Sequence, residues 1–233
     1  MATQYTLQIT NNSTHYGSLC VYATPVDPDK IQFDLRSLAW FSKAANPNTS
    51  VTFSWPLQYS FVWSETGKLV PAVTFIASES QDADPSDANS NRAYFDIQGG
   101  AYKFGQPSSA KPAAPGTLAI TTSGSIPDSK AAIGVGIGGK PALVVNAAPN
   151  YMYTFIPKIK YWVAFGNFIE GEVLDLNAMT SIHEISYPVN EYVKSVILNA
   201  DNTWSEGVSF KEFNDRIRGS RPGREEWSAA RIG

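Results

Sequence analysis

The chain has few of the residue types on which much site chemistry depends. Its 233 residues include one cysteine, Cys20, and two histidines, His15 and His183. A single cysteine excludes an internal disulfide framework, and two further histidines are a poor ligand set for tetrahedral zinc. Cys20 lies between Leu19 and Val21, which favours a buried structural thiol over a reactive one. We therefore expect no metal centre.

Charge and long apolar runs are also scarce. Charged residues make up 17% of the chain, the formal net charge is −3, and no stretch is strongly basic. Nucleic-acid binding needs a clustered basic surface, so we expect none. No apolar run approaches the ~18 residues of a membrane span, and the opening MATQYTLQIT lacks the basic and apolar regions of a signal peptide. The sequence predicts a soluble, cytoplasmic protein without a transmembrane segment.

Aromatic residues, by contrast, are concentrated in the segment 37–67. Seven of them fall between Trp40 and Trp63, where Lys43 is the one charged residue. Each large ring gains on the order of 2–3 kcal/mol by leaving water. From Val51 to Trp63 the apolar residues alternate with polar ones, which is typical of strands with one buried face. Pro56 interrupts this alternation and predicts a bend, a bulge or an edge position.

The rest of the chain carries similar short β signals, separated by Gly, Pro and Asn. Gly99-Gly100 predicts a tight hairpin, and the polar stretch 78–91 predicts a solvated loop. Further strands are expected over 5–9, 19–23, 69–77, 92–98, 101–104, 118–122, 133–137, 142–145, 151–155, 159–165, 168–174, 182–187, 192–198 and 203–206.

These elements predict an all-β fold, an antiparallel β-sandwich or two joined sandwich halves. We expect the β-domain to span residues 1–207, with a possible sub-boundary in the Pro-rich stretch 106–116. Phe210, Phe213 and Ile217 fall at helical spacing, so the segment 208–233 is expected to hold a short C-terminal helix and a tail.

One glycine-rich stretch imitates a phosphate-binding loop. Residues 134–141 read GVGIGGKP, which matches G-x-x-x-x-G-K without its last residue. A true loop needs Ser or Thr after the lysine, to hold magnesium, and a helix that begins at the phosphates. Here Pro141 follows Lys140, and an apolar strand follows in turn. The interpretation we favour is glycine at a close backbone approach within a sheet.

Candidate catalytic and cation-binding residues are few. Three carboxylates, those of Asp82, Asp84 and Asp87, could offer oxygen ligands to a hard cation. The segment lacks the other residues of a calcium-binding loop, so a solvated loop is the interpretation we favour. Whether they bind a cation stays open. His183 beside Glu184 is the one pair that suggests acid–base chemistry, and the sequence shows no nucleophile for it. We assign no catalytic residue and expect no enzymatic activity.

The aromatic excess allows three interpretations. The rings could fill a sandwich core, line a pocket for a flat apolar ligand, or form an exposed patch for a homodimer or a membrane surface. For the pocket interpretation the candidate ligand-binding residues are Trp40, Phe41, Trp55, Tyr59, Trp63, Tyr151, Tyr153, Tyr161 and Trp162.

Two motifs also carry a family resemblance. The stretches WFSKAANP, from Trp40 to Pro47, and YSFVWSETG, from Tyr59 to Gly67, resemble the RhiA-type proteins of rhizosphere bacteria and their fungal relatives. The segment SIHEISYPVNEYVKSVILNADNTWSEG is similar to that family as well, so the resemblance covers most of the chain from Tyr5 to about Gly207. The family has no established enzymatic activity, so the resemblance implies none for this chain.

A further resemblance, to a pink mushroom chromoprotein, implies a noncovalently bound indole-type chromophore. We therefore expect a non-enzymatic binding protein for a small planar aromatic ligand, and a homodimer whose interface helps to bury it. The alternative is a lectin-like or membrane-surface interaction protein without catalysis.

Overall fold

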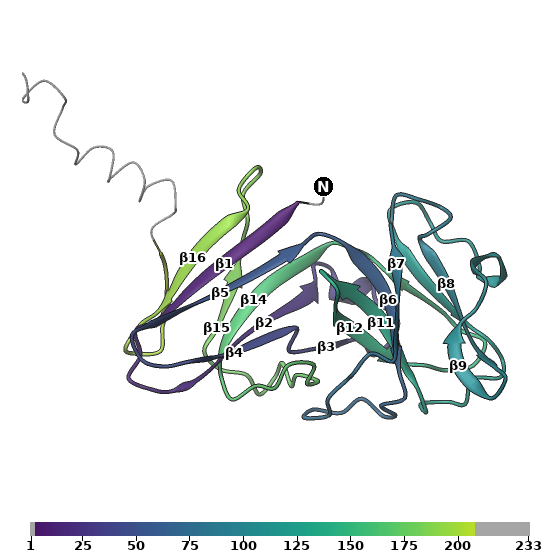
Figure 1. Ribbon diagram of the computed structural model, residues 1–233, viewed down its shortest axis with the longest axis horizontal. Coiled ribbons are helices and arrows are strands. Elements are labelled where there is room, and N and C mark those ends of the chain that lie inside the picture. The colour runs from purple at the N-terminus through teal and green to yellow at the C-terminus, as the bar shows by residue number, and fades with distance from the viewer. Residues whose placement is uncertain (1–2, 208–233) are drawn as a thin grey trace, which may run out of the picture.

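The protein is built from strands throughout the part of the chain that the structure describes. The computed structural model describes residues 3–207, over which the chain forms seventeen strands and two short 3₁₀ helices, η1 (Pro28–Lys30) and η2 (Pro107–Ser109), with no α-helix (Figure 1). The predicted all-β class is confirmed. The predicted helix near 209–218 lies outside the described residues.

Two four-stranded sheets face each other in the first half of the molecule. Their strand orders are β17-β16-β1-β5 and β15-β14-β2-β4. The strands are β1 (Gln4–Asn11), β2 (Gly17–Pro25), β4 (Phe41–Ala45), β5 (Thr49–Pro56), β14 (Ile159–Gly166), β15 (Ile182–Ile185), β16 (Val193–Leu198) and β17 (Trp204–Glu206). Leu7, Ile9, Phe53 and Val163 point between these sheets and are fully buried. The period-two alternation of β1 and β5 therefore marks their inner faces, as predicted.

A five-stranded and a four-stranded sheet form the second half. Their orders are β3-β12-β11-β6-β7 and β13-β10-β8-β9. The strands are β3 (Arg36–Ser37), β6 (Tyr59–Ser64), β7 (Glu79–Ala83), β8 (Arg92–Gln98), β9 (Ala101–Phe104), β10 (Leu118–Thr122), β11 (Ala132–Ile137), β12 (Lys140–Asn146) and β13 (Met152–Phe155). Most pairings in the molecule are antiparallel, as predicted, but β1 with β16 and β8 with β10 pair in parallel. The fold is thus two joined sandwich halves.

The chain crosses between the halves at four places. It passes from β2 to β3 through residues 26–35 and returns from β3 to β4 through residues 38–40. At Pro56 it leaves β5 and turns into β6, which confirms the bend predicted there, and residues 156–158 join β13 to β14. The stretch 106–116 joins β9 to β10, which belong to one sheet. Figure 1 shows β5 and β14 running from the first half toward the second.

Three sequence predictions about local structure were wrong. Residues 69–77 and 168–174 form loops that contribute only isolated bridges, at Thr74 with Glu172 and at Leu38 with Val173. These loops bury Leu69, Phe75 and Leu174 on the outer faces of the sheets, so their apolar residues cover strands instead of pairing as strands. The supposedly solvated stretch 78–91 contains β7, an edge strand that pairs with β6.

The glycine-rich segment is a hairpin. Gly138 and Gly139 take φ values of 58° and 81° and turn β11 into β12 without any helix. Gly134 lies so close to β12 that a Cβ atom there would overlap the Leu143 carbonyl oxygen and approach the Val144 Cα to 2.8 Å. The interpretation of a close backbone approach is confirmed, and a phosphate-binding loop is excluded because the required helix is replaced by a strand.

This close approach predicts a specific cost for a methyl group. Gly134→Ala is expected to destabilise the fold by about 1–3 kcal/mol, because the clash is with the backbone and cannot be relieved by a side-chain rotation. Gly124→Ala is the control, since its Cβ would meet only the mobile amide end of Asn150. Urea unfolding of both variants measures the difference. Equal midpoints for the two would contradict the explanation.

Candidate functional site

Four of the nine predicted ligand-binding residues pack together in the first core. Trp40 and Trp55 are 0% exposed and meet at 5.0 Å between ring centroids. Phe41 lies 4.5 Å from Trp40, and Tyr161 lies 5.4 Å from Trp55. Trp40 Nε1 donates to the Ile137 carbonyl oxygen at 3.0 Å. These rings pack against one another, and Trp40 also borders a surface depression of about 200 Å³.

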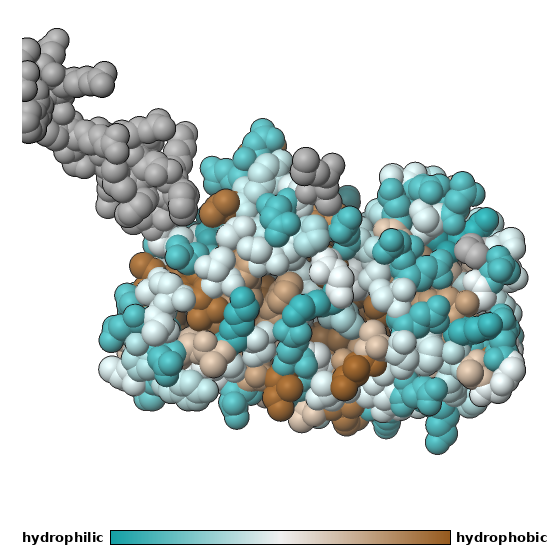
Figure 2. Space-filling view, viewed as in Figure 1, coloured by the Kyte–Doolittle hydropathy of each residue, from teal (hydrophilic) through white to brown (hydrophobic). Residues whose placement is uncertain are grey.

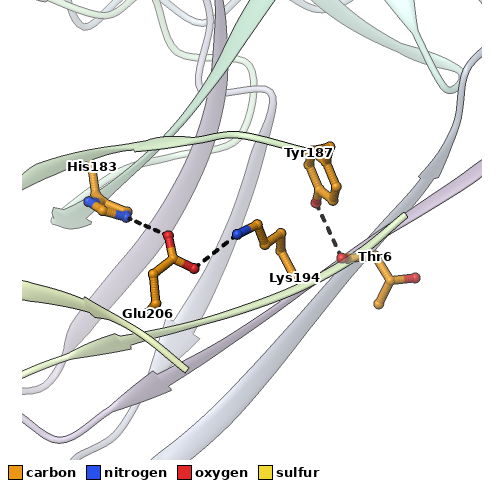
Figure 3. Close-up of polar contacts among 5 residues, drawn as sticks. All are labelled: Thr6, His183, Tyr187, Lys194 and Glu206. Carbon is orange, nitrogen blue, oxygen red and sulfur yellow. Dashed lines mark hydrogen bonds and ion pairs between the residues drawn. The ribbon is translucent and has the colours of Figure 1, made fainter. Parts of the chain in front are cut away.

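Further tyrosines extend this cluster toward the surface. Tyr5 stacks on Trp55 at 6.1 Å and meets the edge of Tyr187 at 4.9 Å. The Tyr187 hydroxyl donates to the Thr6 carbonyl oxygen at 3.2 Å, which ties the segment after β15 to β1 (Figure 3). Trp55 Nε1 is buried without a hydrogen-bond partner among residues 3–207. Sequence reasoning did not select Tyr5 or Tyr187, although both continue alternating strands.

Four more predicted residues lie apart from that cluster. Trp63 and Tyr153 are buried in the second core, where Trp63 Nε1 donates to Glu79 at 2.7 Å. Tyr151 is 40% exposed beside Tyr153. Trp162 lies on the outer face of its sheet and donates to Thr24 Oγ1 at 2.9 Å. The nine residues therefore do not form one pocket.

Tyr59 lines a cavity at the seam where the two halves meet. It packs against both cores, and its hydroxyl donates to the Pro157 carbonyl oxygen at 3.3 Å. The apolar crevice beside it has a volume of only about 10 Å³, room for about one water molecule. It is lined by Pro25, Ile31, Leu35, Tyr59, Leu118, Val135, Ile137, Leu143, Phe155, Ile156, Pro157 and Ile159.

A larger cleft adjoins this crevice on the outside. Its volume is about 400 Å³, and it is lined by Thr24, Pro25, Pro28, Ile31, Phe33, Asp34, Leu35, Ser37 and Leu176. Pro25, Ile31 and Leu35 line both spaces and so separate the crevice from the cleft. We call the cleft, with the crevice behind it, the seam site.

Most of the cleft wall comes from residues 26–35, here called the strap, which crosses from β2 to β3. Two contacts hold the strap in place. The Val26 amide donates to the Lys158 carbonyl oxygen at 3.0 Å. The Phe33 ring packs against Tyr153 and Phe155, with ring centroids 5.2 Å and 5.5 Å apart. Sequence reasoning missed this site. The signal was present, because Ile31, Phe33 and Leu35 alternate with polar residues.

The two residues of the candidate acid–base pair, His183 and Glu184, contact different partners. His183 stacks on Trp204 at 6.0 Å, and its Nε2 lies 3.8 Å from Glu206, which also binds Lys194 at 3.1 Å (Figure 3). Glu184 instead pairs with Lys160 at 3.1 Å. His183 Nε2 has no hydrogen-bond partner within the described chain, so no hydrogen bond joins this atom to a nucleophile. This cluster joins the edges of the two first-half sheets.

Asp84 and Asp87 accept hydrogen bonds within their own turns, whereas Asp82 lies in β7. Asp84 Oδ1 accepts hydrogen bonds from the Ser86 amide at 2.8 Å and the Ser86 hydroxyl at 2.6 Å, and these bonds lower the pKa of Asp84. Asp87 similarly accepts from the Asn89 amide at 2.9 Å. No group of three or more potential metal-ligating side chains occurs within residues 3–207.

Cys20 is fully buried on the face covered by the loop 167–181. Burial, reinforced by the charge of Glu172, raises the pKa of its thiol. Because the thiolate is the reactive form, this environment makes Cys20 inert. The prediction of a buried structural thiol is confirmed.

The comparisons with known proteins agree with the sequence resemblance. The RhiA family model matches residues 2–207. A protein RhiA from Rhizobium leguminosarum bv. viciae is 34% identical over 205 residues, covering 87% of this chain and 85% of the relative. The chain belongs to the RhiA family. No solved structure matches this RhiA-family chain. Within the described residues, no helix is long and apolar enough to cross a membrane.

The buried phenols of this RhiA-family protein predict sensitivity to alkali. Burial raises the pKa of Tyr22 from 10.0 to about 12, with a smaller contribution from Cys20, and burial also raises the pKa values of Tyr161 and Tyr187. In the unfolded chain these phenols ionise near pH ~10. Above that pH the folded state binds more protons than the unfolded state, so stability is expected to fall as pH rises toward about 12.

Urea unfolding at a series of alkaline pH values, followed together with tyrosinate absorbance, measures this loss. Tyr22→Phe should show a shallower decline in midpoint with pH, whereas Tyr16→Phe, at an exposed position, should match the wild type. A midpoint that stays constant between pH ~10 and ~12 would contradict the burial argument.

Proposed function

We propose that this RhiA-family protein is a non-enzymatic binding protein for a small planar aromatic ligand, which it holds in the seam site. The observation that carries the proposal is the cleft of about 400 Å³, whose walls are mainly apolar. Small-molecule sites commonly have ~300–1,000 Å³ and combine apolar walls with a few polar groups. A flat ring would lie against Phe33 and the rigid rings of Pro25 and Pro28.

This proposal moves the ligand contacts away from most of the aromatic residues that the sequence suggested. Three of the predicted tryptophans are buried in the cores: Trp40, Trp55 and Trp63. The seam site is lined instead by residues that include Phe33, Leu35 and Tyr59. An indole-type chromophore belongs to the proposed ligand class because its ring is flat and largely apolar. The homodimer stays a prediction.

Occlusion of the cleft provides the test. Leu176→Trp should fill the cleft from its exposed side and weaken indole binding at least about tenfold, equivalent to ~1.4 kcal/mol. Isothermal titration calorimetry with indole measures the affinity. Val189→Trp is the matched control, because Val189 is 90% exposed and does not line the seam site. If indole neither binds the wild type nor raises its melting temperature, the proposal is wrong.

One observation favours a second candidate function, contact with a membrane surface. Ile76 is 73% exposed and Ile169 is 65% exposed. Their loops, 65–78 and 167–181, are joined by the Phe75 amide, which donates to the Gly171 carbonyl oxygen at 2.8 Å. In Figure 1 both loops lie along the lower edge, where Figure 2 shows hydrophobic residues at the surface. Exposed apolar side chains that form one contiguous patch are typical of interaction sites.

Co-sedimentation with phosphatidylcholine vesicles distinguishes this candidate. Ile76→Glu and Ile169→Glu should each reduce the bound fraction, because a charged side chain resists insertion among lipids. Ser78→Glu adds the same charge to the same loop at an exposed polar position and should bind as the wild type does. No sedimentation of the wild-type protein would eliminate this function.

A further inference from the structure

The cleft of the seam site presents three polar side chains, from Thr24, Asp34 and Ser37. Ser37 is buried, and its hydroxyl donates to the Ala23 carbonyl oxygen at 2.7 Å. Thr24 Oγ1 accepts from Trp162 Nε1 at 2.9 Å, so its own proton is available to another acceptor. These two hydroxyls are neutral.

Asp34 is the one ionisable residue among the nine that line the cleft. Its Oδ2 atom accepts from Arg36 Nη2 at 2.6 Å, while its Oδ1 atom has no hydrogen-bond partner within residues 3–207. The side chain is 73% exposed at the rim. The other charged strap residues lie outside the lining, and Asp27 and Lys30 neutralise each other at 2.7 Å.

We propose that Asp34 makes the seam site select its ligand by charge. This inference rests on the proposed function and adds to it the class of ligand: a flat aromatic ring that carries an amine or another hydrogen-bond donor. The free Oδ1 atom can accept from a ligand N–H group, and a ligand ammonium is attracted to the same carboxylate. A ligand carboxylate that approaches the free Oδ1 atom finds no hydrogen-bond donor there and is repelled by the Asp34 carboxylate, whose charge Arg36 offsets from outside the lining.

Three compounds that share the indole ring test the selection. Tryptamine carries an ammonium, indole is neutral, and indoleacetate carries a carboxylate. Isothermal titration calorimetry at low ionic strength should rank their affinities in that order. The expected difference between the two charged compounds is about two- to fivefold, since Asp34 is exposed, and it should shrink at high salt.

Two matched variants assign the effect to Asp34. Asp34→Asn should abolish or reverse the ranking, because Arg36 then keeps its charge without a carboxylate partner. Asp29→Asn removes the same charge from the same strap, at a residue outside the lining, and should preserve the ranking.

The possible outcomes distinguish failure of charge selection from failure of aromatic-ligand binding. If all three compounds bind with equal affinity, or if Asp34→Asn keeps the wild-type ranking, charge selection is wrong and aromatic binding stands. Tighter binding of indoleacetate than of tryptamine also overturns charge selection. If none of the compounds binds, both proposals fail.

Discussion

The mutual packing of aromatic rings between sheets is the constraint on which the rest of the structure depends. Trp55 contacts Trp40, Tyr5 and Tyr161 within about 6 Å between ring centroids, so its position is determined by rings from three other parts of the chain. Each such ring removes a large apolar area from water and also orients its neighbours. Because β5 ends at Pro56, directly after Trp55, this packing determines where the chain leaves the first half.

The position of the seam follows from where the chain leaves the first half. Tyr59 begins β6 three residues after Pro56, and both Tyr59 and Ile159 pack against the two cores. The strap covers the junction of the two cores, where Phe33 and Leu35 pack against the second. Phe33 anchors the strap to β13, while Ile31 and Leu35 form the partition between crevice and cleft. The candidate site is thus a consequence of joining two sandwich halves.

This arrangement also explains why an aromatic-rich protein need not bind through most of its aromatic residues. Trp40 and Trp63 have their ring nitrogens satisfied by the Ile137 carbonyl and by Glu79, which are contacts of a packed interior. The cleft has few aromatic residues and one ionisable group, Asp34. The RhiA family match spans residues 2–207 and includes every strand of the two halves, so the seam lies within the family match.

Much of the fold could be predicted from local patterns. Alternation marked β1, β5, β6 and β14, and the glycine pair 99–100 marked its hairpin, because strand faces and positive φ angles leave direct traces in residue order. The loops 65–78 and 167–181 could not be identified, since Phe75 and Leu174 are as apolar as strand residues and cover a sheet only after other segments have built it.

The candidate site depended on tertiary structure for the same reason. The chemical character of the chain, with its one buried thiol, sparse charge and alternating rings, follows from residue identity. Which rings fill the cores and which side chains face the cleft follows from contacts between residues far apart in the chain, such as Phe33 with Tyr153 and Thr24 with Trp162. Residue order contains no distance between such segments, and the seam exists only once the halves have met.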